Sequence, residues 1–142
     1  MNLLDKNIKK LIVADDNPEF IEGIEVLIST SPKYEIIETF SNGHDLVYSK
    51  NLHKADILLV DIEMPKLDGL NVAKTVNKQM PFMKMIALTM HIEKIYLEEI
   101  ILAGYRAFIY KPEVTEKLFS ILEMVISGDY SFPENLQMFN LK

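Results

Sequence analysis

Residues 57–69 of this chain read ILLVDIEMPKLDG, a pattern that predicts a buried strand followed by a turn. Its first four residues are aliphatic with no polar alternation, which is typical of a strand buried on both faces of a parallel sheet. Asp61 ends this run, and Pro65 and Gly69 turn the chain away before a helical pattern begins. The Asp61 carboxylate is therefore predicted to lie at the carboxyl edge of the sheet, where open α/β sheets bind ligands.

The whole chain has the size and composition of one globular domain. It has 142 residues, of which 49% are hydrophobic and 25% are charged. No apolar run approaches the roughly 20 residues that span a bilayer, and residues 1–6 lack the layout of a signal peptide, so a cytoplasmic location without membrane contact is expected. The lack of cysteine excludes disulfides and thiolate metal sites, and the net charge of −6 argues against nucleic-acid binding by this stretch.

Apolar runs alternate with helical patterns along the chain. The predicted strands are residues 10–14, 34–40, 57–61, 83–88 and 107–110, and the predicted helices are residues 18–29, 44–51, 70–80, a segment ending at 104, and 115–128. In the fourth helix, Ile95, Ile100 and Ala103 are expected on one side. Five strands alternating with five helices predict a doubly wound α/β fold, with a parallel sheet covered by helices on both faces.

Polar residues stand where four of the predicted strands end. Asp15 and Asp16 follow the first strand, Asp61 ends the third, Thr89 follows the fourth, and Lys111 follows the fifth. Because the carboxyl ends of parallel strands meet at one edge of the sheet, these side chains are expected to lie close together. Their common position points to a functional site.

Three carboxylates at one edge repel one another unless a cation lies among them. Mg²⁺ prefers carboxylates, a carbonyl and several waters, which suits Asp15, Asp16, Asp61 and the backbone carbonyl of Glu63. Zinc would want histidine or cysteine ligands, and the three histidines of the chain have no mutual ligand spacing. The alternative is a set of solvated loop acids that hold no metal.

With a metal bound, Asp61 is a candidate nucleophile toward a phosphoryl group, forming an aspartyl phosphate. Lys111 would neutralise the phosphoryl oxygens, and the Thr89 hydroxyl would hydrogen-bond one of them. Simpler roles stay open for each residue alone, since Lys111 can pair with a neighbouring acid and Thr89 can cap the next helix.

Four motifs together resemble the receiver domain of bacterial response regulators. They are VADD at 13–16, VDIEMP at 60–65 with DG at 68–69, LT at 88–89, and YKP at 110–112. The resemblance spans about residues 10–128, and it implies a flavodoxin-like fold with five parallel strands in the order 2-1-3-4-5.

The resemblance also implies a role for each residue of the motifs. Asp61 would be the phosphoacceptor, Asp15 and Asp16 the acidic pair that holds Mg²⁺, Lys111 the phosphate-contacting lysine, Thr89 the switch hydroxyl, Phe108 the switch aromatic, and Pro112 would follow a cis peptide bond. Phe108 lacks the hydroxyl of the usual tyrosine, so switching there would work through packing.

The closer resemblance is to the NarL/FixJ (LuxR-type) subfamily, through ADDNP at 14–18, LTMH at 88–91 and SGDYSFP at 127–133. In that subfamily a helix-turn-helix DNA-binding domain comes next, and this chain stops at Lys142 without one. The expected organisation is a receiver domain at residues 1–128 and a C-terminal tail or linker at residues 129–142. The apolar residues of the tail predict that it packs against a surface.

The resemblance implies a signalling module that catalyses only its own phosphorylation and dephosphorylation. The expected partners are a sensor histidine kinase and a second copy of the chain, with DNA reached only through an absent output domain that controls transcription. A phosphatase of the haloacid-dehalogenase type is one alternative, but that family wants an aspartate two residues after the nucleophile, where this chain has Glu63. Another alternative is an interaction module that is never phosphorylated, although no acid or lysine of the motifs is missing.

Overall fold

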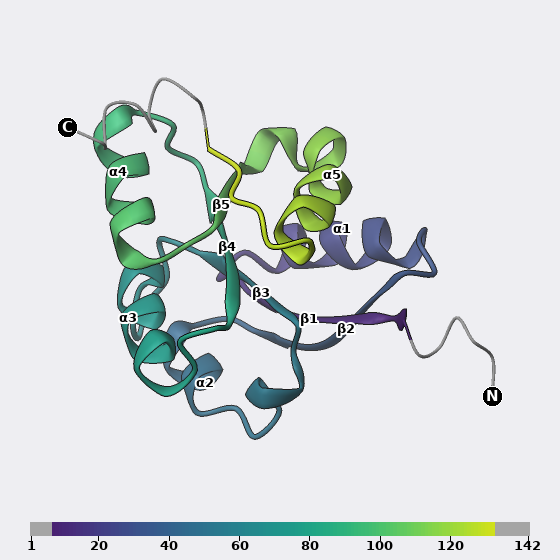
Figure 1. Cartoon of the computed structure of the whole chain (residues 1–142), viewed down its shortest axis with the longest axis horizontal. Helices are drawn as coiled ribbons and strands as arrows, with labels where there is room; N and C mark the ends of the chain where they lie inside the picture. Colours follow the sequence, from purple (N-terminus) through teal and green to yellow (C-terminus); the bar gives the residue numbers. More distant parts are fainter. Residues whose placement is uncertain (1–6, 133–142) are drawn as a thin grey trace.

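The structure, a computed structural model, describes residues 7–132. Five parallel strands form one sheet in the order β2-β1-β3-β4-β5 (Figure 1). They are β1 (Lys9–Ala14), β2 (Tyr34–Phe40), β3 (Ile57–Asp61), β4 (Lys84–Thr89) and β5 (Ala107–Tyr110). The doubly wound, flavodoxin-like fold and the predicted strand order are confirmed.

Helices cover both faces of this sheet (Figure 1). One face carries α1 (Pro18–Ser29) and α5 (Val114–Ile126), and the other carries α2 (Gly43–Val47), α3 (Gly69–Gln79) and α4 (Lys94–Ala103). Two short 3₁₀ turns, η2 (Leu52–Lys54) and η3 (Lys111–Glu113), complete the connections. Within residues 7–132, every helix is too short or too polar to cross a bilayer.

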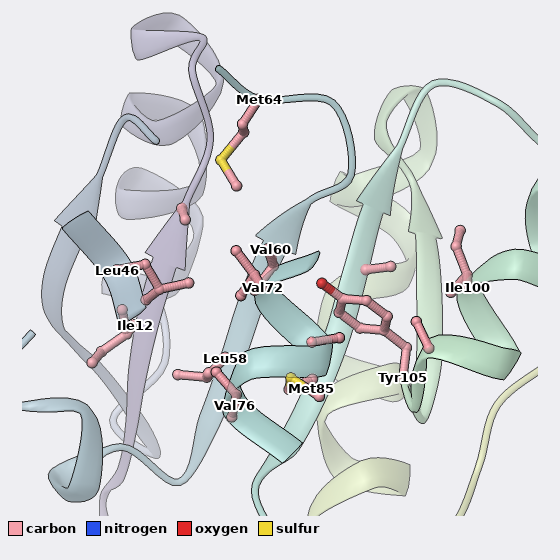
Figure 2. Close-up of a cluster of buried hydrophobic side chains, with 14 of the residues drawn as sticks. Ile12, Leu46, Leu58, Val60, Met64, Val72, Val76, Met85, Ile100 and Tyr105 are labelled. Atoms are coloured by element: carbon pink, nitrogen blue, oxygen red, sulfur yellow. The ribbon is translucent and has the colours of Figure 1, made fainter. Parts of the chain in front are cut away.

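The central strand β3 is buried along its whole length, as its unbroken aliphatic run predicts. Its side chains alternate between two apolar layers, because successive residues of a strand point to opposite faces. Leu58 and Val60 pack with Val72 and Val76 of α3 in one layer (Figure 2). Leu59 packs in the other layer, beneath α1 and α5. A strand anchored on both faces fixes the place where Asp61 leaves the sheet.

Helix α1 begins as its sequence predicts. The Asn17 side chain accepts hydrogen bonds from the amides of Glu19 and Phe20, at 3.0 and 3.3 Å, and Pro18 occupies the first helical position. This cap starts the helix directly after the acidic pair, so Asp15 and Asp16 lie between the end of β1 and the start of α1.

Helix α2 and the Lys111–Pro112 bond differ from the predictions. The predicted helix over residues 44–51 ends at Val47, and the Ser49 hydroxyl bonds the Asn51 amide locally, which competes with continued helix. The prediction of a cis peptide bond before Pro112 is wrong, since the described backbone has no cis peptide bond. Trans is the preferred form of such bonds, by roughly 0.5–1 kcal/mol.

The apolar residues of helix α4 are arranged differently from the prediction. Leu97, Ile100 and Ala103 are buried, but Ile95 is 65% exposed, so the prediction that Ile95 shares one side of the helix with Ile100 and Ala103 is wrong. Ile95 and Ile100 are five residues apart, which places them roughly 140° apart around a helix of 3.6 residues per turn.

The two-layer core predicts a contrast between two leucines. Leu58 is 0% exposed in β3, and Leu102 is 84% exposed in α4. Leu58→Ala is expected to lower the free energy of unfolding by about 2–5 kcal/mol through lost burial and a cavity, whereas Leu102→Ala should change it by no more than about 0.5 kcal/mol. Urea unfolding of both variants measures the difference, and equal losses would contradict this assignment of the core.

Candidate functional site

Three aspartates lie together at the carboxyl edge of the sheet. Asp15 directly follows β1, Asp16 is its neighbour, and Asp61 is the last residue of β3. Each offers a carboxylate oxygen, and these oxygens all lie within 4.8 Å of one another. Asp15 and Asp61 are only 1% and 4% exposed, whereas Asp16 faces solvent. The parallel pairing of β1 with β3 brings the acids together, as their positions at strand ends predict.

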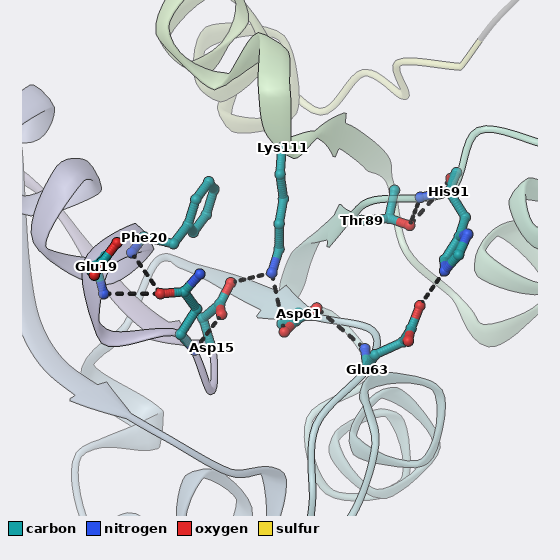
Figure 3. A network of polar contacts seen from close by, with 9 residues as sticks. Asp15, Glu19, Phe20, Asp61, Glu63, Thr89, His91 and Lys111 are labelled. Atoms are coloured by element: carbon teal, nitrogen blue, oxygen red, sulfur yellow. Dashed lines mark hydrogen bonds and ion pairs between the residues drawn. The ribbon is translucent and has the colours of Figure 1, made fainter.

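Lys111 reaches both buried carboxylates (Figure 3). It directly follows β5, and its Nζ lies 2.8 Å from Asp15 Oδ2 and 3.2 Å from Asp61 Oδ2. The ring centroid of Phe20, in the first turn of α1, lies 4.9 Å from the same Nζ. The ammonium therefore offsets the repulsion between the two acids, and the aromatic face adds a cation–π contact.

Backbone amides hold the other oxygen of each buried acid. The Asn17 amide donates to Asp15 Oδ1 over 2.9 Å, and the Glu63 amide donates to Asp61 Oδ1 over 3.2 Å. Asp15 Oδ2 is buried with no hydrogen bond of good geometry, so it relies on the Lys111 ammonium as an ionic partner. Each carboxylate thus has one oxygen fixed by the backbone and one directed at a shared cation.

The loop after Asp61 folds back tightly against the end of β3. A Cβ atom on Gly69 would lie 2.5 Å from the backbone oxygen of Asp61, so this position has no room for a side chain. Lys66 and Leu67 have φ values of 50° and 88°, a conformation uncommon for residues other than glycine. This compact turn holds the Glu63 amide against Asp61.

The acids and the lysine change one another's protonation. Burial and the charge of Asp15 raise the pKa of Asp61 to about 7, against the opposing effects of Lys111 and the Glu63 amide. Burial alone would lower the pKa of Lys111, but its close ion pair with Asp15 and the charge of Asp61 outweigh burial and raise that pKa. Lys111 therefore stays protonated, and a further cation would favour the ionised form of Asp61.

The acidic cluster suits a hard cation. It gathers oxygen atoms from two buried acids and one exposed acid, and Asp15 Oδ2 is a buried acceptor without a hydrogen bond. Carboxylate oxygens with access to water are what divalent ions such as Mg²⁺ prefer. The described residues thus form an acidic cluster able to bind a metal ion, and the part assigned to the Glu63 carbonyl stays a prediction.

Thr89 and Phe108, the two residues expected to switch, lie on adjacent strands. Thr89 is buried at the end of β4, where its hydroxyl donates to the His91 carbonyl over 3.1 Å and accepts from the His91 amide over 2.9 Å. The hydroxyl is therefore engaged with its own loop. Phe108 lies in β5 opposite Ala87, and its ring stacks with that of Phe132 at a centroid distance of 6.1 Å.

His91 lies at the rim of the site, a role that the sequence did not reveal. Its Nε2 pairs with the Glu63 carboxylate (Figure 3), and its ring stacks on Tyr96 with centroids 4.8 Å apart. These three side chains, with Thr89, line a groove of about 590 Å³ beside the acids. The one feature of the sequence that could have pointed to this role of His91 is its position two residues after Thr89. The contact of Phe20 with Lys111 had no comparable feature in the sequence.

Comparison with known proteins identifies the class of this fold and site. Residues 11–123 match the response regulator receiver domain, and the chain belongs to that family. The transcriptional regulatory protein DegU of Brevibacillus brevis is 22% identical over 125 residues, which covers 88% of this chain and 53% of DegU. The transcriptional regulatory protein YdfI of Bacillus subtilis (strain 168) is 31% identical over 120 residues, covering 84% of this chain and 56% of YdfI.

Solved structures agree with this family. The non-phosphorylated receiver domain of RcsB from Escherichia coli matches with a TM-score of 0.81 and 25% identity, covering 90% of this chain and all of that one. The receiver domain of NarL from Mycobacterium tuberculosis matches with a TM-score of 0.80 and 22% identity, covering 86% of this chain and 98% of that one, and this likeness supports the fold. The predicted membership of the response regulator receiver family is confirmed. The chain spans little more than half the length of the curated relatives it matches.

The raised pKa of Asp61 predicts how stability depends on pH when no divalent ion is present. Because the pKa is about 7 in the folded state and 3.8 in the reference state, the folded state holds the proton more tightly, and stability should fall as pH rises from about 4 to about 7. Asp61→Asn removes the ionising group and should unfold at a higher temperature than the parent at pH 8 in EDTA, with a gain on the order of 1–3 kcal/mol.

The exposed Asp129 provides a matched control. Asp129→Asn should leave the thermal unfolding profile of the parent unchanged between pH 4 and pH 8. An Asp61→Asn protein that is less stable than the parent at pH 8 in EDTA would contradict the raised pKa.

Proposed function

We propose that this domain accepts a phosphoryl group on Asp61 from a sensor histidine kinase. One observation carries the proposal: the buried Asp61 carboxylate ends the central strand with the Lys111 ammonium 3.2 Å away and two further acids beside it. Solvated loop acids would not gather around a partly buried lysine in this way. Membership of the receiver family supports the same role.

In the proposed reaction, an Asp61 carboxylate oxygen attacks the phosphorus atom of a phosphohistidine. A new oxygen–phosphorus bond forms, the phosphorus–nitrogen bond breaks, and the histidine nitrogen keeps the electron pair of the broken bond. Lys111, which now contacts both Asp15 and Asp61, is placed to transfer its contacts to the phosphoryl oxygens and to neutralise their charge.

Asp15, Asp16 and Asp61, with the Glu63 carbonyl, are the residues proposed to hold Mg²⁺. A bound Mg²⁺ would neutralise the acids and the incoming phosphoryl oxygens, which would otherwise repel one another. The protein's own part is to fix Asp15 and Asp61 through the Asn17 and Glu63 amides, so that both keep one oxygen facing the shared position.

The proposed switch joins Asp61 to the surface of β5. A phosphoryl oxygen would draw the Thr89 hydroxyl away from the His91 loop, and the Phe108 ring would then turn toward the space that Thr89 leaves. Since Phe108 has no hydroxyl, this movement would be driven by packing alone.

The proposed biological role is a signalling module in the cytoplasm that catalyses only its own phosphorylation and dephosphorylation. Pairing with a second copy of the chain, and control of transcription through a DNA-binding part beyond these residues, belong to the same proposal. Names of relatives such as DegU and the structure of RcsB from Salmonella enterica bound to a promoter with a phosphomimetic support it. The net charge of −6 argues against DNA contact by this stretch itself.

The phosphoacceptor assignment is tested by replacing the Asp61 carboxylate with an amide. Incubation of the chain with acetyl phosphate and Mg²⁺ should add one phosphate, seen by intact mass, and Asp61→Asn should abolish the adduct because an amide is not a competent nucleophile. Asp129→Asn, the exposed control, should still gain the phosphate. A phosphate adduct on the Asp61→Asn protein would overturn the assignment.

The metal assignment is tested at the exposed acid. Asp16→Asn should weaken Mg²⁺ binding by at least about tenfold because it removes a carboxylate ligand, and it should leave the fold intact because Asp16 faces solvent. Amide chemical shifts followed through a Mg²⁺ titration report the affinity, with Asp129→Asn again as the control. An affinity equal to that of the parent would count against the metal role of Asp16.

A further inference from the structure

The chain does not leave the domain after α5 but returns along the edge of the sheet (Figure 1). Gly128, with a φ of 97°, follows the end of the helix, and the Asp129 amide bonds the Met124 carbonyl over 2.9 Å. Ser131 then forms a parallel bridge with Ala107, the first residue of β5. We call residues 130–132 the return segment.

Three kinds of contact hold the return segment to β5. The Ser131 amide donates to the Arg106 carbonyl over 2.8 Å, and the Arg106 guanidinium lies 5.6 Å from the ring centroid of Tyr130. The ring of Phe132 stacks on that of Phe108, with centroids 6.1 Å apart and an interplanar angle of 25°. A backbone hydrogen bond, a cation–π contact and an aromatic stack therefore converge on the edge strand.

The outer edge of β5 can form backbone hydrogen bonds with another extended segment. Within residues 7–132, β4 is the one strand that pairs with β5, so the outer backbone groups of β5 face away from the sheet and can pair with another segment. The return segment satisfies the backbone carbonyl of Arg106, the residue directly before β5. Beside it, a groove of about 330 Å³ runs along α5, with Phe108 and Phe132 in its wall and Tyr110, Ile121 and Met124 around them.

We infer that the edge of β5 and the Phe108 ring form an internal docking site for the return segment, and that its occupancy is coupled to the state of Asp61. Phe108 is the one ring that both the proposed switch and the return segment use. When it turns toward Thr89, Phe132 loses its stacking partner and the segment is released from β5. The coupling part of this inference rests on the proposed function, whereas the docking part does not.

The coupling is reciprocal, as it must be for any two linked equilibria. A docked Phe132 holds the Phe108 ring outward and therefore opposes the phosphorylated state. Release of the return segment then changes both the position and the freedom of the chain at the C-terminal end of the domain, which is where a following segment would receive the signal.

Amide hydrogen exchange of Ser131, followed by NMR, tests docking without phosphorylation. Phe132→Ala should speed this exchange by at least about twofold, the factor that corresponds to the loss of one aromatic pair. Phe82→Ala removes a phenylalanine that is 86% exposed and should leave the Ser131 exchange unchanged. Equal exchange in the parent and in Phe132→Ala would overturn the docking site.

The coupling is tested on the full chain with acetyl phosphate and Mg²⁺, with the adduct counted by intact mass in the same sample. The phosphorylated parent should show the Ser131 exchange of the Phe132→Ala variant, and the Phe82→Ala protein should respond as the parent does. An adduct with unchanged Ser131 exchange would overturn the coupling and leave the phosphoacceptor role standing. A chain that forms no adduct would overturn the proposed function and the coupling with it, while the exchange of Phe132→Ala would still decide the docking site.

Discussion

Repulsion among buried carboxylates is the constraint on which this site depends. Asp15 and Asp61 are almost fully buried side by side, and the exposed Asp16 adds a third charge. In a low-dielectric setting, such acids are tolerated only with a cation among them. Lys111 supplies that charge, and it follows β5, the outermost strand beyond β4. The pairing of β1, β3, β4 and β5 therefore brings the lysine to the acids and stabilises their positions.

The same constraint explains how the site can respond to a ligand. The Lys111 ammonium contacts both Asp15 and Asp61 and lies against the ring of Phe20. These contacts fix its position without tying it to a single carboxylate. The raised pKa of Asp61 shows that one ammonium does not fully offset the burial of this carboxylate and the charge of Asp15. Because negative charge remains at this site, a divalent ion binds to it more favourably than it would bind to a fully neutralised site.

Backbone geometry contributes as much as charge. The turn after β3 approaches the end of the strand so closely that Gly69 has no room for a side chain, and Leu67 adopts a φ of 88°. This turn places the Glu63 amide on Asp61 and the Glu63 carboxylate on His91, so one loop contacts both the reactive acid and the rim of the site. A change at Asp61 is therefore only a few contacts away from the loop after β4 and from β5.

The fold and most of the site could be predicted from the sequence. Unbroken aliphatic strands and polar residues at their ends placed Asp15, Asp61, Thr89 and Lys111 at one edge, because the geometry of parallel sheets leaves little freedom there. Contacts between distant segments were decided only by the tertiary structure. Such contacts depend on packing angles and side-chain rotamers that no local pattern encodes, and they include His91 with Glu63, Phe20 with Lys111, and Phe132 with Phe108. The exposure of Ile95 has the same origin, since the position of α4 against the sheet selects which of its several apolar faces is buried.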